Sequence, residues 1–134
     1  MSIHLEMMAL VVADYDEAIA WYSEKLGFEL VEDTALSPEK RWVVMAPSRA
    51  SGARILLAKA KGPEQAARIG DQTGGRVFLF LHTTDFDVTY AAYRAAGVPF
   101  IEEPRHESYG RVCVFEDLYG NRWDLVERRD DQNP

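Results

Sequence analysis

The chain has 134 residues, of which 47% are hydrophobic and 28% are charged, and its formal net charge is −7. This length suits one domain, or two small modules that share a core. An acidic chain lacks the basic face of a nucleic-acid binder and is poorly suited to an anionic membrane surface. No apolar run approaches the roughly 20 residues that span a bilayer, and no signal peptide is recognisable. With its single cysteine, Cys113, the sequence predicts a cytoplasmic protein without nucleic-acid or membrane partners.

The first half predicts one strand, one helix and three further strands. Residues 3–12 alternate imperfectly and favour a strand. Asp14 suits the N-cap of the helix that follows, because its carboxylate can accept the free amide hydrogens of the first turn. Gly27 suits the left-handed residue that ends this helix. Three short strands are expected after the helix, at residues 28–32, 41–45 and 53–60.

The second half repeats this plan. A strand over Val77–His82 precedes a helix that opens at Thr84 or Asp85 and closes at Gly97. The opening and closing residues lie 13 positions apart in both halves when Thr84 is taken as the start. Three strands are expected next, at residues 98–101, 110–115 and 122–127, with a turn at 117–121.

The repeat divides the chain into a first βαβββ module at 3–61 and a second at 76–128. A glycine-bearing connection at 62–75, with a possible short helix, joins them, and 129–134 form a charged tail. One such module leaves a sheet face uncovered, so two modules are expected to pair.

Two segments resemble the vicinal oxygen chelate superfamily, which includes glyoxalases, bleomycin-resistance proteins and extradiol dioxygenases. Residues 11–28 carry an aromatic–tyrosine pair ahead of Leu-Gly-Phe, and residues 114–125 carry an Asp-x-x-Gly-Asn turn before the last strand. The resemblance implies a single domain over 1–134 with an α+β fold. In it, two βαβββ modules form a curved mixed-sheet cup with the helices outside. It also implies a homodimer.

The resemblance further implies four positions at which the family's enzymes hold a divalent metal. These positions fall on Met7, Leu56, Phe78 and Asp124, and among them Asp124 alone offers a usual nitrogen or oxygen ligand. We therefore expect no cofactor and no metal site, with a divalent metal as the less favoured alternative. Lyase and ring-cleaving dioxygenase activities that need the metal are correspondingly disfavoured.

His82 is the first candidate for chemistry. Side chains alternate along a strand, so His82 is expected to share the cavity face with Phe78 and Phe80. There it can act as an acid, a base or a hydrogen-bond donor. The alternative is a histidine at the end of a strand that bonds only to nearby backbone.

Asp124 is the second candidate, because a carboxylate between Trp123 and Leu125 is expected to be paired or to have a raised pKa. It would bind a polar ligand group or a weak metal. The alternative is a purely structural ion pair, for which three arginines are available: Arg54, Arg111 and Arg122.

The segment 105–111 is rich in groups that bind anions or phenols, and His106, Tyr109 and Arg111 are candidate ligand contacts. A solvated polar loop is the alternative. His106 together with His82 and Asp124 also has the composition of a relocated metal site.

We expect the protein to bind a small, partly apolar organic molecule in the cup. The candidate catalytic residues are His82 and Asp124. Trp42 is a further candidate contact through stacking on an aromatic ligand, although core packing is the alternative. The full set of candidate ligand contacts is Met7, Trp42, Leu56, Phe78, Phe80, His106, Tyr109 and Arg111.

Whether the protein is an enzyme stays open at the level of the sequence. The favoured hypothesis is binding or sensing without a metal. The alternatives are a glyoxalase-like lyase or isomerase that uses His82 and Asp124 for acid–base chemistry, and an oxygenase with a relocated metal.

Overall fold

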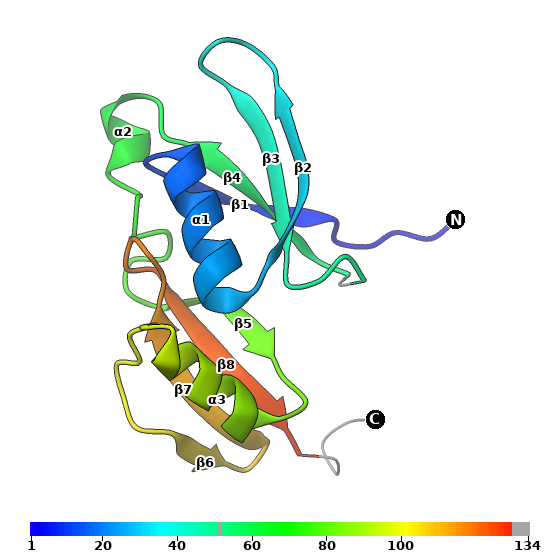
Figure 1. The fold of residues 1–134 in the computed structure, drawn as a ribbon, viewed down its shortest axis with the longest axis vertical. Coiled ribbons are helices and arrows are strands. Elements are labelled where there is room, and N and C mark those ends of the chain that lie inside the picture. Colours follow the sequence, from blue (N-terminus) through cyan, green and yellow to red (C-terminus); the bar gives the residue numbers. More distant parts are fainter. Residues whose placement is uncertain (51, 130–134) are drawn as a thin grey trace. The chain divides into compact units, whose positions relative to one another are not determined.

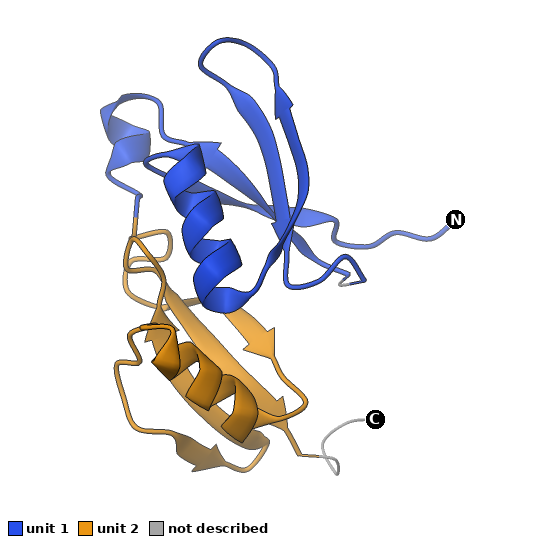
Figure 2. Cartoon of the chain, viewed as in Figure 1, with its two compact units in different colours: residues 1–69 blue, residues 70–134 orange. Residues whose placement is uncertain are grey.

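The computed structural model describes residues 1–50 and 52–129 (Figure 1). The chain separates into two compact units, residues 1–69 and residues 70–134 (Figure 2). No helix within the described ranges is both long and apolar enough to cross a membrane.

The first unit is a four-stranded mixed sheet with a helix packed on it. Its strands lie in the order β1-β4-β3-β2, with β1 parallel to β4 and the other neighbours antiparallel. The elements in chain order are β1 (Met7–Val12), α1 (Tyr15–Leu26), β2 (Glu29–Ala35), β3 (Arg41–Ala46), β4 (Arg54–Lys59) and the short α2 (Gly62–Ala66).

The second unit repeats this topology. Its strands lie in the order β5-β8-β7-β6, with β5 parallel to β8 and the other neighbours antiparallel. The elements are β5 (Val77–His82), α3 (Phe86–Ala95), β6 (Arg105–Glu107), β7 (Gly110–Glu116) and β8 (Arg122–Arg128). The predicted α+β fold with two βαβββ modules is therefore confirmed.

Both main helices begin where the sequence predicts, and for the predicted reason. The Asp14 carboxylate accepts a hydrogen bond from the Glu17 amide at 2.8 Å, and Asp85 does the same for the Val88 amide at 3.2 Å. Gly27 ends α1 with a φ of 72°, a left-handed conformation that other residues rarely adopt.

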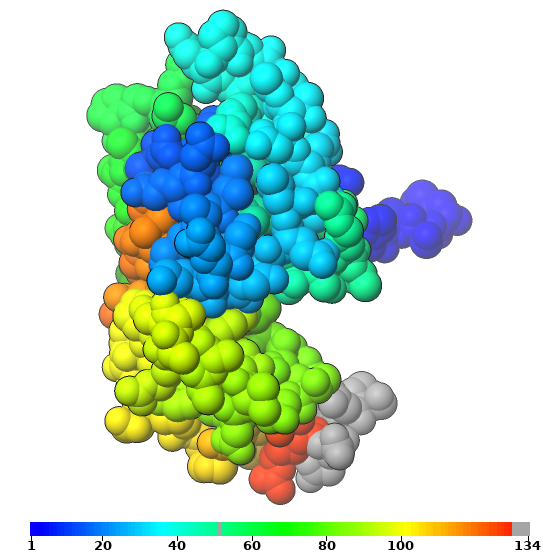
Figure 3. Space-filling view, viewed as in Figure 1, coloured from blue at the N-terminus to red at the C-terminus, as the bar shows by residue number. Residues whose placement is uncertain are grey.

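Each unit buries an apolar face between its sheet and its helix. In the first unit Leu10 and Val12 of β1 are fully buried, as is Ala18 of α1. In the second unit Phe86 of α3 and Phe115 of β7 are fully buried. The six residues ahead of β1 are exposed. The N-terminal part of this segment projects from the first unit (Figure 3, dark blue), whereas the Glu6 carbonyl accepts a hydrogen bond from the Arg54 amide at 3.1 Å.

The prediction of a strand at residues 98–101 is wrong. This segment runs beside β7 but forms only an isolated bridge between Phe100 and Phe115. Its ladder is interrupted because the Val114 amide donates to the Glu102 carboxylate, at 2.9 Å, instead of to backbone. The short strand β6 lies within the stretch that was expected to be a loop.

Candidate functional site

One face of the second sheet is covered by α3 (Figure 1), and the other carries the candidate site. Phe80 is paired with Asp124, and His82 with Val126, across the parallel ladder of β5 and β8. Val126 is in turn paired with Val112 of β7. Paired residues point to the same side of a sheet, so these side chains share the face away from α3.

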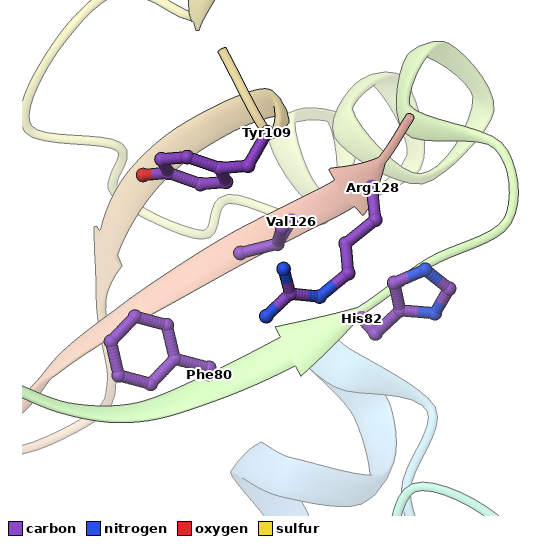
Figure 4. Close-up of a pocket in the computed structure, with 5 residues that line it drawn as sticks. All are labelled: Phe80, His82, Tyr109, Val126 and Arg128. Atoms are coloured by element: carbon purple, nitrogen blue, oxygen red, sulfur yellow. The ribbon is translucent and has the colours of Figure 1, made fainter. Parts of the chain in front are cut away.

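An open pocket of about 560 Å³ lies on this face (Figure 4). This volume is within the range of roughly 300–1,000 Å³ that small-molecule sites occupy. Figure 4 shows the ring of Tyr109 on one side of β8 and the ring of Phe80 on the other, with Val126 between them. The lining residues are Phe80, His82, Tyr109, Val126 and Arg128.

Phe80 is the most unusual of these residues, because 70% of its surface is exposed. A large exposed aromatic side chain at a pocket is a common feature of binding surfaces. Phe80 and His82 therefore lie together as the strand alternation predicted. Phe78 does not belong to the lining, and the register of β5 shifts between Val77 and Leu79, so the alternation does not extend through it.

Asp124 is buried on the same face, only 5% exposed. Its Oδ1 atom has no hydrogen-bond partner among the described residues. Burial raises the pKa of this carboxyl group; Arg105 opposes the rise, whereas Glu102 and Glu107 add to it. An unpaired buried carboxyl group is costly when ionised.

The predicted ion pairs of Asp124 within the second unit are absent from the described residues. Arg111 instead pairs with Asp87 of α3, and Arg122 lies 4.0 Å from Glu116. The cation whose charge acts on Asp124 is Arg105, which the sequence did not single out.

Arg105 is the centre of a small charged cluster on β6. Its Nε atom lies 3.1 Å from Glu102 Oε1 and its Nη1 atom 2.7 Å from Glu107 Oε1. In register, Arg105 is paired with Val112 and Glu107 with Gly110, so both side chains face the pocket side of the sheet. Both carboxylates of this cluster are therefore engaged by one arginine.

His106 and Arg111 lie on the opposite face. They are paired with each other in the β6–β7 ladder, and the Arg111 guanidinium stacks over the Phe86 ring of α3 with 4.5 Å to its centroid. The structure therefore does not bring His106 beside His82 and Asp124, as a relocated metal site requires. No group of three or more metal-binding side chains occurs within residues 1–50 and 52–129.

The four positions that the resemblance assigns to a metal do not fit one. Leu56 is the third residue of β4 and Asp124 the third of β8, so the repeat makes them equivalent. The first of these two positions holds a leucine, which cannot bind a metal. The other two positions, Met7 and Phe78, lie on the first strand of each unit. One carboxylate among three apolar side chains is not a nitrogen–oxygen ligand set.

The remaining candidates share a face of the first sheet. Leu56 is paired with Ala9 on one side and with Val44 on the other. Met7 shares the parity of Ala9, and Trp42 shares that of Val44, so these side chains point to the side of Leu56. Trp42 is half-buried there.

His82 and Asp124 are not joined in this structure. Each is paired with a different residue, and they are offset by two positions along the ladder. Because Asp124 Oδ1 has no partner in the described chain, the two side chains do not form an acid–base couple through that atom.

Two lining residues, Val126 and Arg128, were missed by the sequence analysis. Both share the parity of Asp124 on β8, and this alternation is a signal that could have identified them. Arg128 lies four residues beyond Asp124, at the end of the strand.

Comparisons with known proteins agree with this architecture. A family model described as the glyoxalase/bleomycin resistance protein/dioxygenase superfamily matches residues 4–125. A protein of Shewanella frigidimarina (strain NCIMB 400) is 52% identical over 126 residues, which are 93% of each chain.

Two solved structures are similar in both sequence and fold. UcmS2 is 33% identical with a TM-score of 0.81, and the match covers 94% of this chain and 98% of that one. TnmS3, an antibiotic-binding protein from Streptomyces sp. CB03234, is 26% identical with a TM-score of 0.77, covering 96% and 99%.

Proposed function

Since this chain belongs to the glyoxalase/bleomycin resistance protein/dioxygenase superfamily, we propose that it binds a small, partly apolar organic molecule without transforming it. The binding site is the open face of the second sheet. The observation that carries this proposal is the pocket of about 560 Å³ between the rings of Phe80 and Tyr109, with His82 and Arg128 as its polar groups.

The composition of the pocket supports a ligand with an aromatic or otherwise flat apolar part. Phe80 leaves most of its ring exposed, and burying an apolar surface of this kind on binding is favourable by roughly 25 cal/mol per Å². Val126 offers an apolar floor between the two rings. TnmS3 supports the same conclusion by analogy, because it is an antibiotic-binding protein of similar fold.

We propose that the protein acts without a resident catalytic metal. The side chains at the expected ligand positions support this, because Met7, Leu56 and Phe78 occupy three of the four positions at which the superfamily's enzymes carry metal ligands. Sequestration or sensing of a compound then suits the site better than metal-dependent chemistry.

We also propose that two copies associate in the cytoplasm. The resemblance implies a dimer, and Ile3 and Leu5 ahead of β1 are 86% and 67% exposed, which leaves apolar surface for a second chain. Light scattering on the purified protein measures the mass directly, and a monomer at micromolar concentration would contradict this proposal.

A thermal-shift screen of aromatic compounds tests the binding proposal. A ligand present at 100 times its Kd stabilises the folded state by about 2.7 kcal/mol. We expect hits that are lost in Phe80→Ala and kept in Val88→Ala, a control on α3 whose residue is 64% exposed. Mass spectrometry of each recovered compound distinguishes binding from turnover, and a converted compound would overturn the proposal.

A further inference from the structure

The side chain of Arg128 is a cation in the pocket that has no partner among the residues that the structure describes. It makes no hydrogen bond or ion pair with the described residues, whereas Arg41, Arg105 and Arg111 are each held by a carboxylate. Figure 4 shows the guanidinium over the pair of strands β5 and β8, between Phe80 and His82. A guanidinium has five donors in a planar fork that matches an acidic group.

Among residues 1–50 and 52–129, the acids on this face are held by other groups or lie at a distance from Arg128. Glu107 stands level with Arg128, because Gly110 is paired with both of them, but Arg105 holds its carboxylate at 2.7 Å. Asp124 lies four residues back along β8, roughly 13 Å at the usual rise of a strand. β7 presents only Gly110, Val112 and Val114 between these charges.

Gly110 is the residue of β7 that is paired with Arg128. A side chain at this position would overlap the carbonyl oxygen of Glu127, and the φ of 151° is one that side-chain-bearing residues avoid. The sheet therefore has no side chain between Glu107 and Arg128.

We infer that the ligand of this pocket is an aromatic anion, with its ring between Phe80 and Tyr109 and its acidic group, a carboxylate or sulfonate, on Arg128. The inference rests on the proposed binding function and specifies the class of ligand. His82 is the neighbouring polar group at the end of β5 and can donate a further hydrogen bond. The rings supply the apolar contact and Arg128 supplies the selection for charge.

Two fluorescent probes of matched shape test this inference. 8-Anilinonaphthalene-1-sulfonate carries a sulfonate, and N-phenyl-1-naphthylamine is its uncharged counterpart. We expect Arg128→Gln to weaken binding of the sulfonate about tenfold, which is what one charge-assisted hydrogen bond contributes, and to leave binding of the neutral probe unchanged. Phe80→Ala should weaken both probes.

The control is Arg76→Gln, which removes the same charge from an exposed residue ahead of β5, outside the pocket. Cooperative melting of each variant verifies that it is folded. Equal affinity for the sulfonate in Arg128→Gln and in the unmodified protein would overturn the inference that the ligand is an anion, and it would leave the proposed function intact. If the unmodified protein binds neither probe, or if Phe80→Ala affects neither, the proposed function fails and the inference fails with it.

Discussion

Phe80 lies directly opposite Asp124 in the parallel ladder of β5 and β8, so a largely exposed aromatic ring stands beside a buried carboxyl group. The two residues have opposite exposures, 70% and 5%, although they share one face. Such a combination is unfavourable for stability at both positions and is typical of a surface that is completed by a ligand.

Replacing Asp124 by asparagine should stabilise the protein at neutral pH. Burial raises the pKa of this carboxyl group, so the folded state holds its proton more tightly than the unfolded state does. Stability therefore falls as the pH rises from the ordinary carboxyl pKa of about 3.9 through the raised value. We expect Asp124→Asn to be more stable by about 1 kcal/mol at pH 7.

The advantage should disappear at about pH 2.5, where the carboxyl group is protonated in both states. Urea unfolding at the two pH values measures it. Glu103→Gln, at an exposed position in the same unit, is the control for the change of net charge. An asparagine variant that is less stable at pH 7 would show that an ionised Asp124 is stabilised by a partner.

Replacing Phe80 by alanine should separate binding from folding. Its ring is mostly exposed, so the loss of stability should stay within about 0.5 kcal/mol. The affinity for aromatic ligands should nevertheless fall. Differential scanning calorimetry measures the first effect and probe titration the second, and a large drop in Tm would mean that the ring is part of the core.

Replacing Asp117 by alanine should cost about 3 kcal/mol or more. Its Oδ1 accepts from the amides of Tyr119, Gly120 and Asn121. Its Oδ2 accepts from the side-chain amide of Asn121 at 3.1 Å and from the indole N–H of Trp123 at 3.3 Å. Removal of the carboxylate takes away the acceptor that these donors share at the start of β8.

Asp117→Asn is the matched variant, because it keeps one oxygen acceptor for the three backbone amides. Its stability should lie between that of the alanine variant and that of the unmodified protein. Equal stability of all three proteins in guanidinium unfolding would exclude the carboxylate as the organiser of this turn.

Replacing Arg41 by glutamine should destabilise the first unit by about 1 kcal/mol. The guanidinium lies 2.7 Å from Asp33 and 2.9 Å from Asp16, and it stacks over the Tyr15 ring with 5.1 Å to its centroid. Its hydrogen bond lowers the pKa of Asp33. The stability that this ion pair with Asp33 contributes is therefore present above the ordinary aspartate pKa, and it is lost as the pH falls through the lowered pKa of Asp33.

Arg49→Gln is the control for Arg41, because its pair with Glu29 is longer, at 3.9 Å, and these two side chains are more exposed than those of Arg41 and Asp33. Urea unfolding at pH 7 and at pH 2.5 should show a larger difference for Arg41 at the higher pH. A difference that is equal at both values would assign the effect to packing on Tyr15 alone.

The thiol of Cys113 should react slowly in the folded protein. Burial, followed by the negative charges of Glu102 and Asp124, raises its pKa to about 11. At pH 8 the thiolate is then on the order of one part in a thousand, and the thiolate is the reactive form. Labelling with Ellman's reagent should be slow without urea and fast in it, and a native rate equal to that of free cysteine would contradict the burial.

The sequence by itself determined the repeated plan of strands and helices. These features depend on residues that act within a few positions of one another: Asp14 and Asp85 at the helix starts, Gly27 at a helix end and Asp117 in the last turn. Hydrophobic alternation also placed Phe80 and His82 on one face correctly. The resemblance added the family and the four positions where a metal is usually held.

Only the tertiary structure decided which face each side chain of residues 98–111 occupies. The Val114 amide is satisfied by Glu102 from a distant position in the chain, and this bond interrupts the expected strand. The register of β6 on β7 then places His106 and Arg111 on the helix side. Strand register depends on pairing between segments, and one residue of shift exchanges the two faces. The sequence therefore specified the modules, whereas the pairing of strands selected Arg128 rather than Arg111 as the cation of the pocket.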